Sequence, residues 1–373
     1  MAKSKSKKQV TLKEVAAHAN VSVMTVSNVV RGWPYVSDEN RRKVQEAIEV
    51  MDYRPSAVAR TLVTGRSCTV GVVLPDISNP FFGQVVRGCE DVLSADSYSL
   101  ILCNTDENMA KERAAIDMLI GRGVDALILW GSRLPGGELA KRTGDDLPLI
   151  AVDGSMPPAA QNSTYVMVDN AAGAALATRH LIQLGHRQIG HLAGPWKCRL
   201  TAQQRLNGYE AALAEAAIPY DPALVVEGKP SIRGGYLAAK QLLGSQRPSG
   251  LFCYNDLMAT GAIVAIQEAG MDVPRDIAVV GFDDIFTAAL VVPSLTTMRI
   301  SQYDLGRMTS ELLLERLRDP QLPHKVVSFP VELVLRDSCG ARHLSPLDKQ
   351  AMMESLVTSM AVDLPSCDDQ DES

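Results

Sequence analysis

The sequence has little cysteine and no long apolar run. Its seven cysteines are an odd number and form no CxxC pair, which argues against a disulfide framework or a zinc site and favours a reducing compartment. No apolar stretch approaches the roughly 18 residues of a membrane span, and the basic N-terminus lacks the apolar core of a secretory signal. We therefore expect a soluble protein of the cytoplasm, with no membrane partner.

Motifs of common enzymes are also missing. The segment after the first apolar strand reads PDISNP at 75–80 instead of G-x-G-x-x-G, and the chain has no G-x-x-x-x-G-K-[ST], G-x-S-x-G or H-E-x-x-H. The six histidines show no metal-ligand spacing. These absences argue against the common enzyme classes, and no metal or cofactor is expected.

Charge is divided unevenly along the chain. Residues 1–66 contain 12 Lys and Arg against 6 Asp and Glu, a net of +6, whereas the rest contains 25 against 37, a net of −12. A basic head on an acidic body predicts a polyanionic partner for the head alone. The alternative is a merely solvated basic tail, but the excess continues well beyond the first lysines, to Arg41, Arg42, Lys43 and Arg66.

The head contains a helix-turn-helix pattern. Thr11 and Glu14 fit a capping box, and Val15, Ala16 and Ala19 then fall on one helical face. Residues 20–22 break this helix, and Ser22 can cap a second one over 23–31. Val26 and Val29 would be buried in it, which leaves an outer face suited to a DNA major groove. Ser37 predicts the cap of a third helix with Val44 and Ala47 buried.

Apolar strands alternate with amphipathic helices through the long middle of the chain. We expect strands at 70–74, 100–103, 126–129, 149–152, 189–192, 250–253 and 277–280, and helices at 84–95, 171–184, 206–217, 234–243 and 258–269. This α/β pattern predicts two lobes of doubly wound parallel sheets, from residues 70–160 and 165–290, with segment 295–335 crossing back to complete them. A ligand site is expected at the carboxyl ends of the strands.

Four segments follow from these patterns. Residues 1–54 form the helix-turn-helix domain, and residues 55–66 form a linker whose short helix would be marginal in isolation. Residues 67–340 form the two-lobed body. Residues 341–373 end in SCDDQDES and read as an acidic, disordered tail; whether 346–364 pairs dimers further stays open.

These motifs, taken in order, resemble the lactose-repressor/galactose-repressor (LacI/GalR) family of bacterial transcription regulators. The resemblance runs over residues 10–340 through VTLKEVAAHANVS, YRPSAVARTL, DISNPFF, LGHRQIGHLAGP, TAQQRLNGY, FCYNDLMATGA, VPRDIAVVGFDD and PSLTTM. It implies a periplasmic-binding-protein-like body and a homodimer that binds a pseudo-palindromic operator in double-stranded DNA. The function implied is an allosteric repressor of carbohydrate genes, associated with the nucleoid.

The resemblance also implies DNA contacts. Phosphates would be contacted by Thr25 and Ser27 with the helix start at Ser22, and bases by Val23, Met24 and Asn28. The family commonly has Arg where this chain has Asn28, which shifts the expected preference from guanine toward adenine. Arg60 and Leu62 belong to the linker, where the leucine would wedge into a central base step. Burial of Met24 in the head core and packing of Leu62 on the body are the alternatives.

Effector contacts are implied for eight residues of the body. They are Phe81, Phe82, Asp153, Arg199, Thr201, Arg205, Asn255 and Asp283. Aromatic rings can stack on a sugar face, and a guanidinium with a carboxylate can hold vicinal hydroxyls. A sugar is favoured over a purine, although Arg199 with Thr201 also matches the purine-binding variant of the family. The alternative for each polar residue is a structural salt bridge, most credibly for Asp153. A solute-binding protein or an enzyme on the same fold are the competing functions.

Overall fold

The computed structural model describes residues 10–30, 33–53, 65–144, 146–154 and 163–341. These residues form two compact units, the first ending at Cys68 and the second beginning at Thr69. The linker residues Arg60 and Leu62 and the acidic tail from residue 342 on lie outside the described residues.

The described residues of the first unit, the head, form three helices: α1 (Leu12–Ala19), α2 (Val23–Val30) and α3 (Asp38–Val50). The capping box is confirmed, since Thr11 N donates to Glu14 Oε2 (2.8 Å) and Glu14 N donates to Thr11 Oγ1 (3.3 Å). Asn20 ends α1 in the left-handed conformation, at φ 52°. The buried apolar side chains form one small core, made of Val15, Ala16, Ala19, Val26, Val29, Val44, Ala47 and Tyr53.

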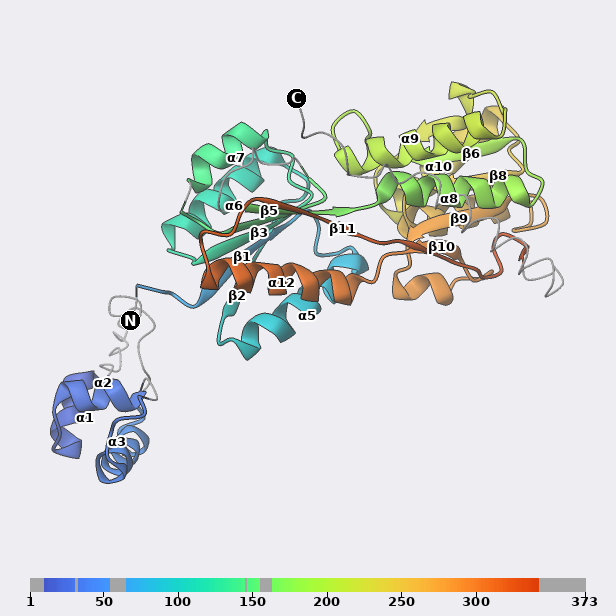
Figure 1. Cartoon of the computed structure of the whole chain (residues 1–373). Helices are drawn as coiled ribbons and strands as arrows, with labels where there is room; N and C mark the ends of the chain where they lie inside the picture. The colour runs from blue at the N-terminus through green and yellow to red at the C-terminus, as the bar shows by residue number, and fades with distance from the viewer. Residues whose placement is uncertain (1–9, 31–32, 54–64, 145, 155–162, 342–373) are drawn as a thin grey trace, which may run out of the picture. The chain divides into compact units, whose positions relative to one another are not determined.

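The second unit, the body, is built on two six-stranded sheets (Figure 1). The first sheet has the order β2 (Ser99–Asn104), β1 (Thr69–Leu74), β3 (Ala126–Trp130), β4 (Leu149–Val152), β5 (Ser163–Val168) and β11 (Lys325–Phe329), all parallel. The second has the order β7 (Val225–Glu227), β6 (Ile189–Ala193), β8 (Gly250–Cys253), β9 (Ala278–Asp283), β10 (Thr296–Arg299) and β12 (Glu332–Val334), of which only β12 is antiparallel.

Helices complete each lobe. The first has α5 (Pro80–Ala95), α6 (Met109–Gly121), α7 (Gly136–Thr143) and α12 (Gln302–Arg318). The second has α8 (Asn170–Gln183), α9 (Leu200–Glu215), α10 (Ile232–Ser245) and α11 (Asp256–Glu268), with 3₁₀ turns at Pro222–Leu224 and Phe286–Ala289. When the strands are counted along the chain within each sheet, both sheets have the order 2-1-3-4-5. This shared order confirms the prediction of a doubly wound α/β fold.

Within the described residues, three passages of the chain join the two lobes. They run from β5 to α8, from β10 to α12 and from β11 to β12. The prediction that 295–335 returns to complete both sheets is therefore confirmed. The predicted boundary between the two lobes, placed between residues 160 and 165, is wrong for one element. Strand β5 belongs to the first sheet, because it pairs with β4 on one side and with β11 on the other.

Helices α5 and α12 lie side by side along the first sheet (Figure 1). Two glycines make this close approach possible. A Cβ on Gly88 would stand 2.1 Å from the Tyr303 carbonyl oxygen, and one on Gly306 would stand 2.0 Å from that of Val85. The returning segment is thereby packed tightly onto the first lobe.

Candidate functional site

The exposed face of α2 is the first candidate site. Ser22 caps this helix as expected: its Oγ accepts a hydrogen bond from Thr25 N (3.0 Å) and lies 2.9 Å from Thr25 Oγ1. Val26 and Val29 are buried below. The amide groups at the start of α2 and the side chains beside them are thus held in a fixed arrangement at the surface.

The predicted base-reading positions lie on this exposed face. Met24 is 68% exposed and Val23 is 42% exposed, so the alternative of Met24 as a core residue is wrong. Thr25, Ser27 and Asn28 are partly exposed.

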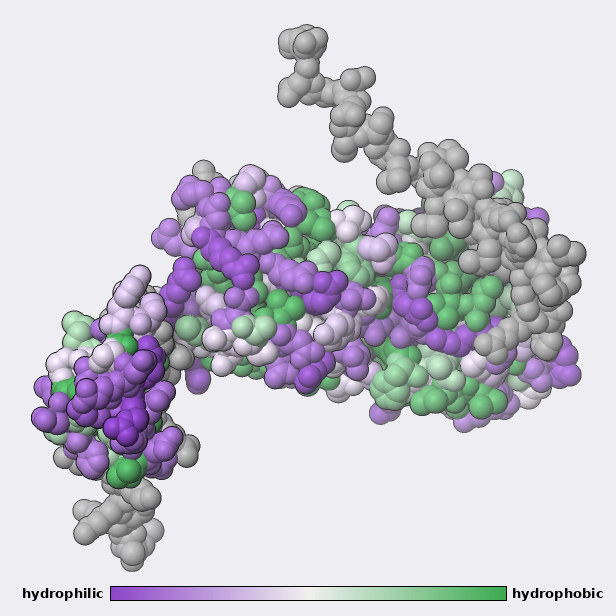
Figure 2. All heavy atoms as spheres, turned by 60° about the horizontal axis from the view of Figure 1, so that its bottom comes forward, coloured by the Kyte–Doolittle hydropathy of each residue, from purple (hydrophilic) through white to green (hydrophobic). Residues whose placement is uncertain are grey.

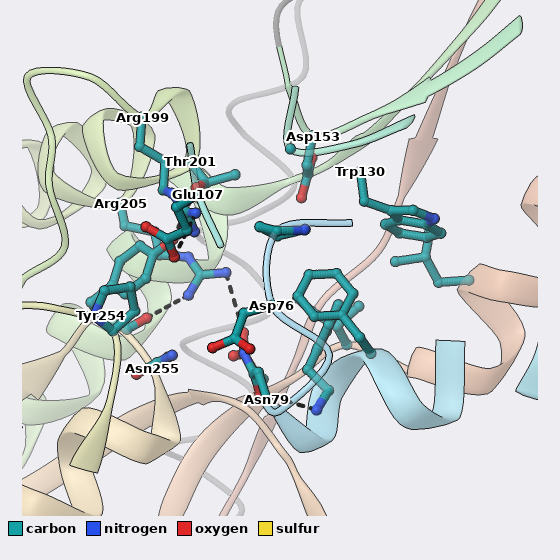
Figure 3. A pocket seen from close by; sticks show the side chains of 18 residues that line it. Asp76, Asn79, Glu107, Trp130, Asp153, Arg199, Thr201, Arg205, Tyr254 and Asn255 are labelled. Carbon is teal, nitrogen blue, oxygen red and sulfur yellow. Dashed lines mark hydrogen bonds and ion pairs between the residues drawn. The ribbon is translucent and has the colours of Figure 1, made fainter. Parts of the chain in front are cut away.

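The second candidate site is a pocket in the body, which we call the inner pocket. It encloses about 740 Å³ of space free of protein atoms, including open solvent at its mouth. All eight residues predicted for the effector line it (Figure 3). Their elements explain why: Asp153 follows β4, Asn255 follows β8 and Asp283 ends β9, each at the carboxyl end of a strand.

One wall of the inner pocket is aromatic. Phe81 and Phe82 lie in the first turn of α5, which Asn79 caps through its Oδ1 (3.1 Å from Phe81 N). Their ring centroids are 5.2 Å apart, and Phe82 meets Trp130 edge-on at 6.3 Å. Such a wall can cover the apolar face of a flat or ring-shaped ligand.

Opposite this wall lies a buried guanidinium, that of Arg205. It is only 5% exposed. Its Nη2 donates to Asp283 Oδ1 (3.3 Å), its Nε donates to Asn170 Oδ1 (2.9 Å) and its Nη1 donates to the Tyr254 carbonyl. The Arg205 Cζ atom lies 3.6 Å from the centroid of the Phe282 ring. Contacts on every side fix the orientation of this cation.

Two carboxyl groups beside this cation have shifted pKa values. Burial raises the pKa of Asp283 to about 6, although Arg205 opposes the shift. Burial likewise raises the pKa of Asp153 to about 6, opposed by hydrogen bonds from Val168 N (2.8 Å) and Asn170 Nδ2 (3.2 Å). Both residues have positive φ, 48° at Asp153 and 109° at Asp283, a backbone conformation that is concentrated at functional sites.

Asn170 joins these groups into one chain of hydrogen bonds. Its Nδ2 contacts Asp153 from the first lobe, and its Oδ1 contacts Arg205 from the second. Asn170 begins α8, directly after the passage between the lobes. The sequence did not single it out.

Arg199 and Thr201 meet at a tyrosine hydroxyl. The Tyr254 hydroxyl lies 3.0 Å from Thr201 Oγ1 and 3.4 Å from Arg199 Nη1. Arg199 Nη2 also forms an ion pair with Glu107 Oε1 at 2.8 Å. Since Glu107 follows β2 and Arg199 precedes α9, this pair crosses from one lobe to the other (Figure 3).

Asn255 has a structural task as well. It is buried and caps α11, with its Oδ1 accepting from Met258 N (3.0 Å). Asp153 also makes structural contacts, but they are hydrogen bonds from Val168 N and Asn170 Nδ2 and not the salt bridge that the alternative for it proposed. Both Asn255 and Asp153 line the inner pocket.

Sequence reasoning missed several lining residues. Asp76, Glu107, Trp130, Pro230 and Tyr254 also face the inner pocket. Trp130 and Tyr254 stand at the end of β3 and directly after β8, so position at a strand end was the signal that could have identified them.

Two further features bear on the class of protein. Among the described residues, no three His, Cys, Asp or Glu side chains are grouped so that they could hold a metal ion. No helix in the described part of the chain has the length and apolar character needed to cross a membrane.

Comparison with known proteins finds a family model that matches part of each unit of the chain. Residues 11–56 match the bacterial regulatory proteins of the lacI family, and residues 178–339 match the periplasmic binding protein-like domain. The "HTH-type transcriptional repressor PurR" of Aliivibrio fischeri (strain MJ11) is 34% identical over 332 residues, which are 88% of this chain and 98% of the relative. The "Ribose operon repressor" of Haemophilus influenzae is 36% identical over 332 residues, with the same coverage of 88% and 98%.

Solved structures match over similar lengths. The lac repressor dimer bound to operator and the anti-inducer ONPF has a TM-score of 0.79 and 30% identity, covering 89% of this chain and 99% of that one. A complex of the transcriptional regulator CelR with cellobiose has a TM-score of 0.66 and 29% identity, covering 88% and 100%. The chain therefore belongs to the LacI family of bacterial regulatory proteins. It is a transcriptional repressor and not an enzyme.

Proposed function

We propose that a sugar bound in the inner pocket controls the affinity of this repressor for its operator. The observation that carries the proposal is the pairing of an aromatic wall, Phe81 to Trp130, with the buried Arg205–Asp283 ion pair. A ring can stack on the first while its hydroxyls bind the second.

A sugar is favoured because several carboxylates line the inner pocket. Carboxylates of Asp76, Asp153 and Asp283 line the inner pocket, and ionised carboxylates accept hydrogen bonds from hydroxyl groups. The ribose repressor among the relatives, and a LacI-family regulator from Enterococcus faecium solved with bound ribose, support this choice. A purine is the second candidate, because aromatic rings also stack on bases and several relatives are named PurR.

Ligand binding would act through the lobes. The lining of the inner pocket comes from both sheets, and Asn170 links Asp153 to Arg205 beside one of the three passages. A ligand that contacts both lobes favours one arrangement over another by its difference in affinity, commonly about 1–3 kcal/mol.

The DNA-bound form we propose is a homodimer. Two heads would place the α2 faces in successive major grooves of a pseudo-palindromic operator. Figure 2 shows an apolar area on the lower edge of the second lobe, and Phe286, Leu290 and Val292 of that lobe are exposed by 68%, 70% and 81%. Exposed apolar area of this kind supports association of two bodies.

Genomic fragment capture with the full chain tests this proposal. The purified protein is incubated with sheared genomic DNA, with and without mixed sugars or purines, and the retained DNA is sequenced. We expect a near-palindrome whose retention changes with a sugar but not with a purine. Arg205→Ala should retain the palindrome and lose the sugar response, while Arg275→Ala, an exposed arginine of the second lobe, should behave as wild type. A normal response in Arg205→Ala rejects the pocket.

A further inference from the structure

A second cavity adjoins the inner pocket, and we call it the outer cavity. It holds about 1220 Å³ of space free of protein atoms, including open solvent. Asp76, Glu107 and Pro230 line both spaces, so the two lie next to each other. Beyond this junction the outer cavity is lined by polar side chains from both lobes, among them Asp106, Arg133, Cys198, Glu227, Lys229 and Ser231.

The two spaces differ in chemistry. The inner pocket has an aromatic wall and a deeply buried ion pair, whereas none of the described residues that line the outer cavity is aromatic. Glu227 and Lys229 are exposed to solvent. The outer cavity is therefore suited to a polar group that keeps part of its water and is held by hydrogen bonds.

The junction carries acceptors that can serve both spaces. Glu107 is fixed from two sides: its carboxylate pairs with Arg199 at 2.8 Å, and its carbonyl oxygen accepts from Arg133 Nη1 at 2.8 Å. Asp76 is oriented by Ser78, whose N and Oγ donate to its Oδ1 at 2.9 and 2.7 Å. The carboxylates of Asp76 and Glu107 are thus fixed in position where the inner pocket and the outer cavity meet.

From this geometry we infer that the effector is a disaccharide. One ring occupies the inner pocket against Phe82, and the second ring lies in the outer cavity, with the linkage passing Glu107 and Pro230. This inference rests on the proposed function and specifies the size and class of the sugar. A single ring would leave the outer cavity to solvent and gain nothing from its polar lining.

Isothermal titration of the full chain provides the test. Maltose, cellobiose, lactose, sucrose and trehalose are each compared with their component monosaccharides. We expect one disaccharide to bind at least about tenfold more tightly than its components, a difference of about 1.4 kcal/mol. Cys198→Trp, which fills the outer cavity, should remove that advantage and leave monosaccharide binding unchanged, whereas Cys198→Ser should bind as wild type.

Alkylation of Cys198 supplies an independent readout. This thiol is exposed, while Cys89, Cys253 and Cys339 are buried. The bound disaccharide should slow its reaction with N-ethylmaleimide, followed by peptide mass spectrometry, and saturating monosaccharide should not.

The outcomes separate the two proposals. If monosaccharides bind as tightly as every disaccharide, or if Cys198→Trp weakens both kinds equally, the disaccharide inference is wrong and the sugar-controlled repressor stands. If no sugar binds at all, the proposed function itself fails. Tighter disaccharide binding together with protection of Cys198 supports both.

Discussion

Arg205 and Asp283 form an ion pair inside the second lobe, with Nη2 and Oδ1 3.3 Å apart and both side chains less than a tenth exposed. Arg205 lies in α9, and Asp283 is the last residue of β9, 78 residues further along the chain. Asn170 and Phe282 hold the guanidinium from two other directions. The pair is therefore both a structural element of the lobe and the most strongly oriented charge in the inner pocket.

Removing one charge of this pair should destabilise the protein. Asp283→Asn leaves the Arg205 guanidinium buried without its counter-ion, and breaking such a pair commonly costs about 3–5 kcal/mol. We expect the free energy of unfolding, measured by urea titration, to fall by that amount. Arg87→Ala removes an exposed pair with Asp91 (2.9 Å) and should cost less than about 1 kcal/mol. Equal costs for the two variants would contradict a special role for the buried pair.

His180 and His191 should each contribute less to the stability of the protein as the pH falls from about 6.5 to about 4. Burial lowers the pKa of His180 and of His191 from 6.5 to about 4. In this window each of these histidines binds a proton in the unfolded chain but not in the folded one, so its contribution to the free energy of unfolding decreases as the pH falls. The raised pKa values of Asp153 and Asp283 act in the opposite direction below about pH 6, so the histidine contribution is measured by substitution. Each histidine can contribute up to about 3 kcal/mol, at 1.36 kcal/mol per pKa unit.

His180→Leu isolates one of these contributions. Neither ring nitrogen of His180 contacts a polar partner within the described part of the chain, so an apolar replacement removes a buried polar group without breaking a hydrogen bond. We expect the difference in unfolding free energy between this variant and wild type to grow in favour of the variant as the pH falls from 6.5 to 4, with stability at pH 7.5 equal to wild type or greater. A slope identical to that of wild type would show that His180 does not titrate in this range.

Asn28 should set part of the operator sequence. Asn pairs bidentately with adenine and Arg with guanine, and each such pair contributes about 1–3 kcal/mol of discrimination. We expect Asn28→Arg to move the preference at one symmetric pair of positions from adenine to guanine, as read from DNA selected out of a random pool. Gln45→Arg, on an exposed position of α3, is the control for added charge. A shift in overall affinity without a change of base would assign Asn28 to phosphate contact.

Leu62 should contribute to operator affinity and not to sugar affinity. It lies outside the described residues, and its role as a wedge between base pairs remains a prediction from the resemblance. Leu62→Ala is expected to weaken operator binding in a mobility-shift assay while sugar affinity by titration stays unchanged. Wild-type operator affinity in this variant would remove Leu62 from the DNA-binding set.

Much of the fold could be predicted from local pattern. All seven expected strands are present, because runs such as ALILW at 126–130 combine continuous apolar character with flanking turns. Strand β11, KVVSF at 325–329, joins the first sheet far from its neighbours in sequence. No local sequence pattern assigns β11 to the first sheet. The wrong assignment of β5 to the second lobe has the same cause.

The sequence by itself determined the capped helices of the head, the alternation of strands and helices and, through the family motifs, eight residues of the inner pocket. Only the tertiary structure decided that Glu107 reaches Arg199, that Asn170 joins Asp153 to Arg205, and that a second cavity adjoins the first. Local periodicity reports which face of an element is buried. Contacts between strand ends of different lobes depend on sheet order and on three passages of the chain, which bring together residues that are distant in sequence.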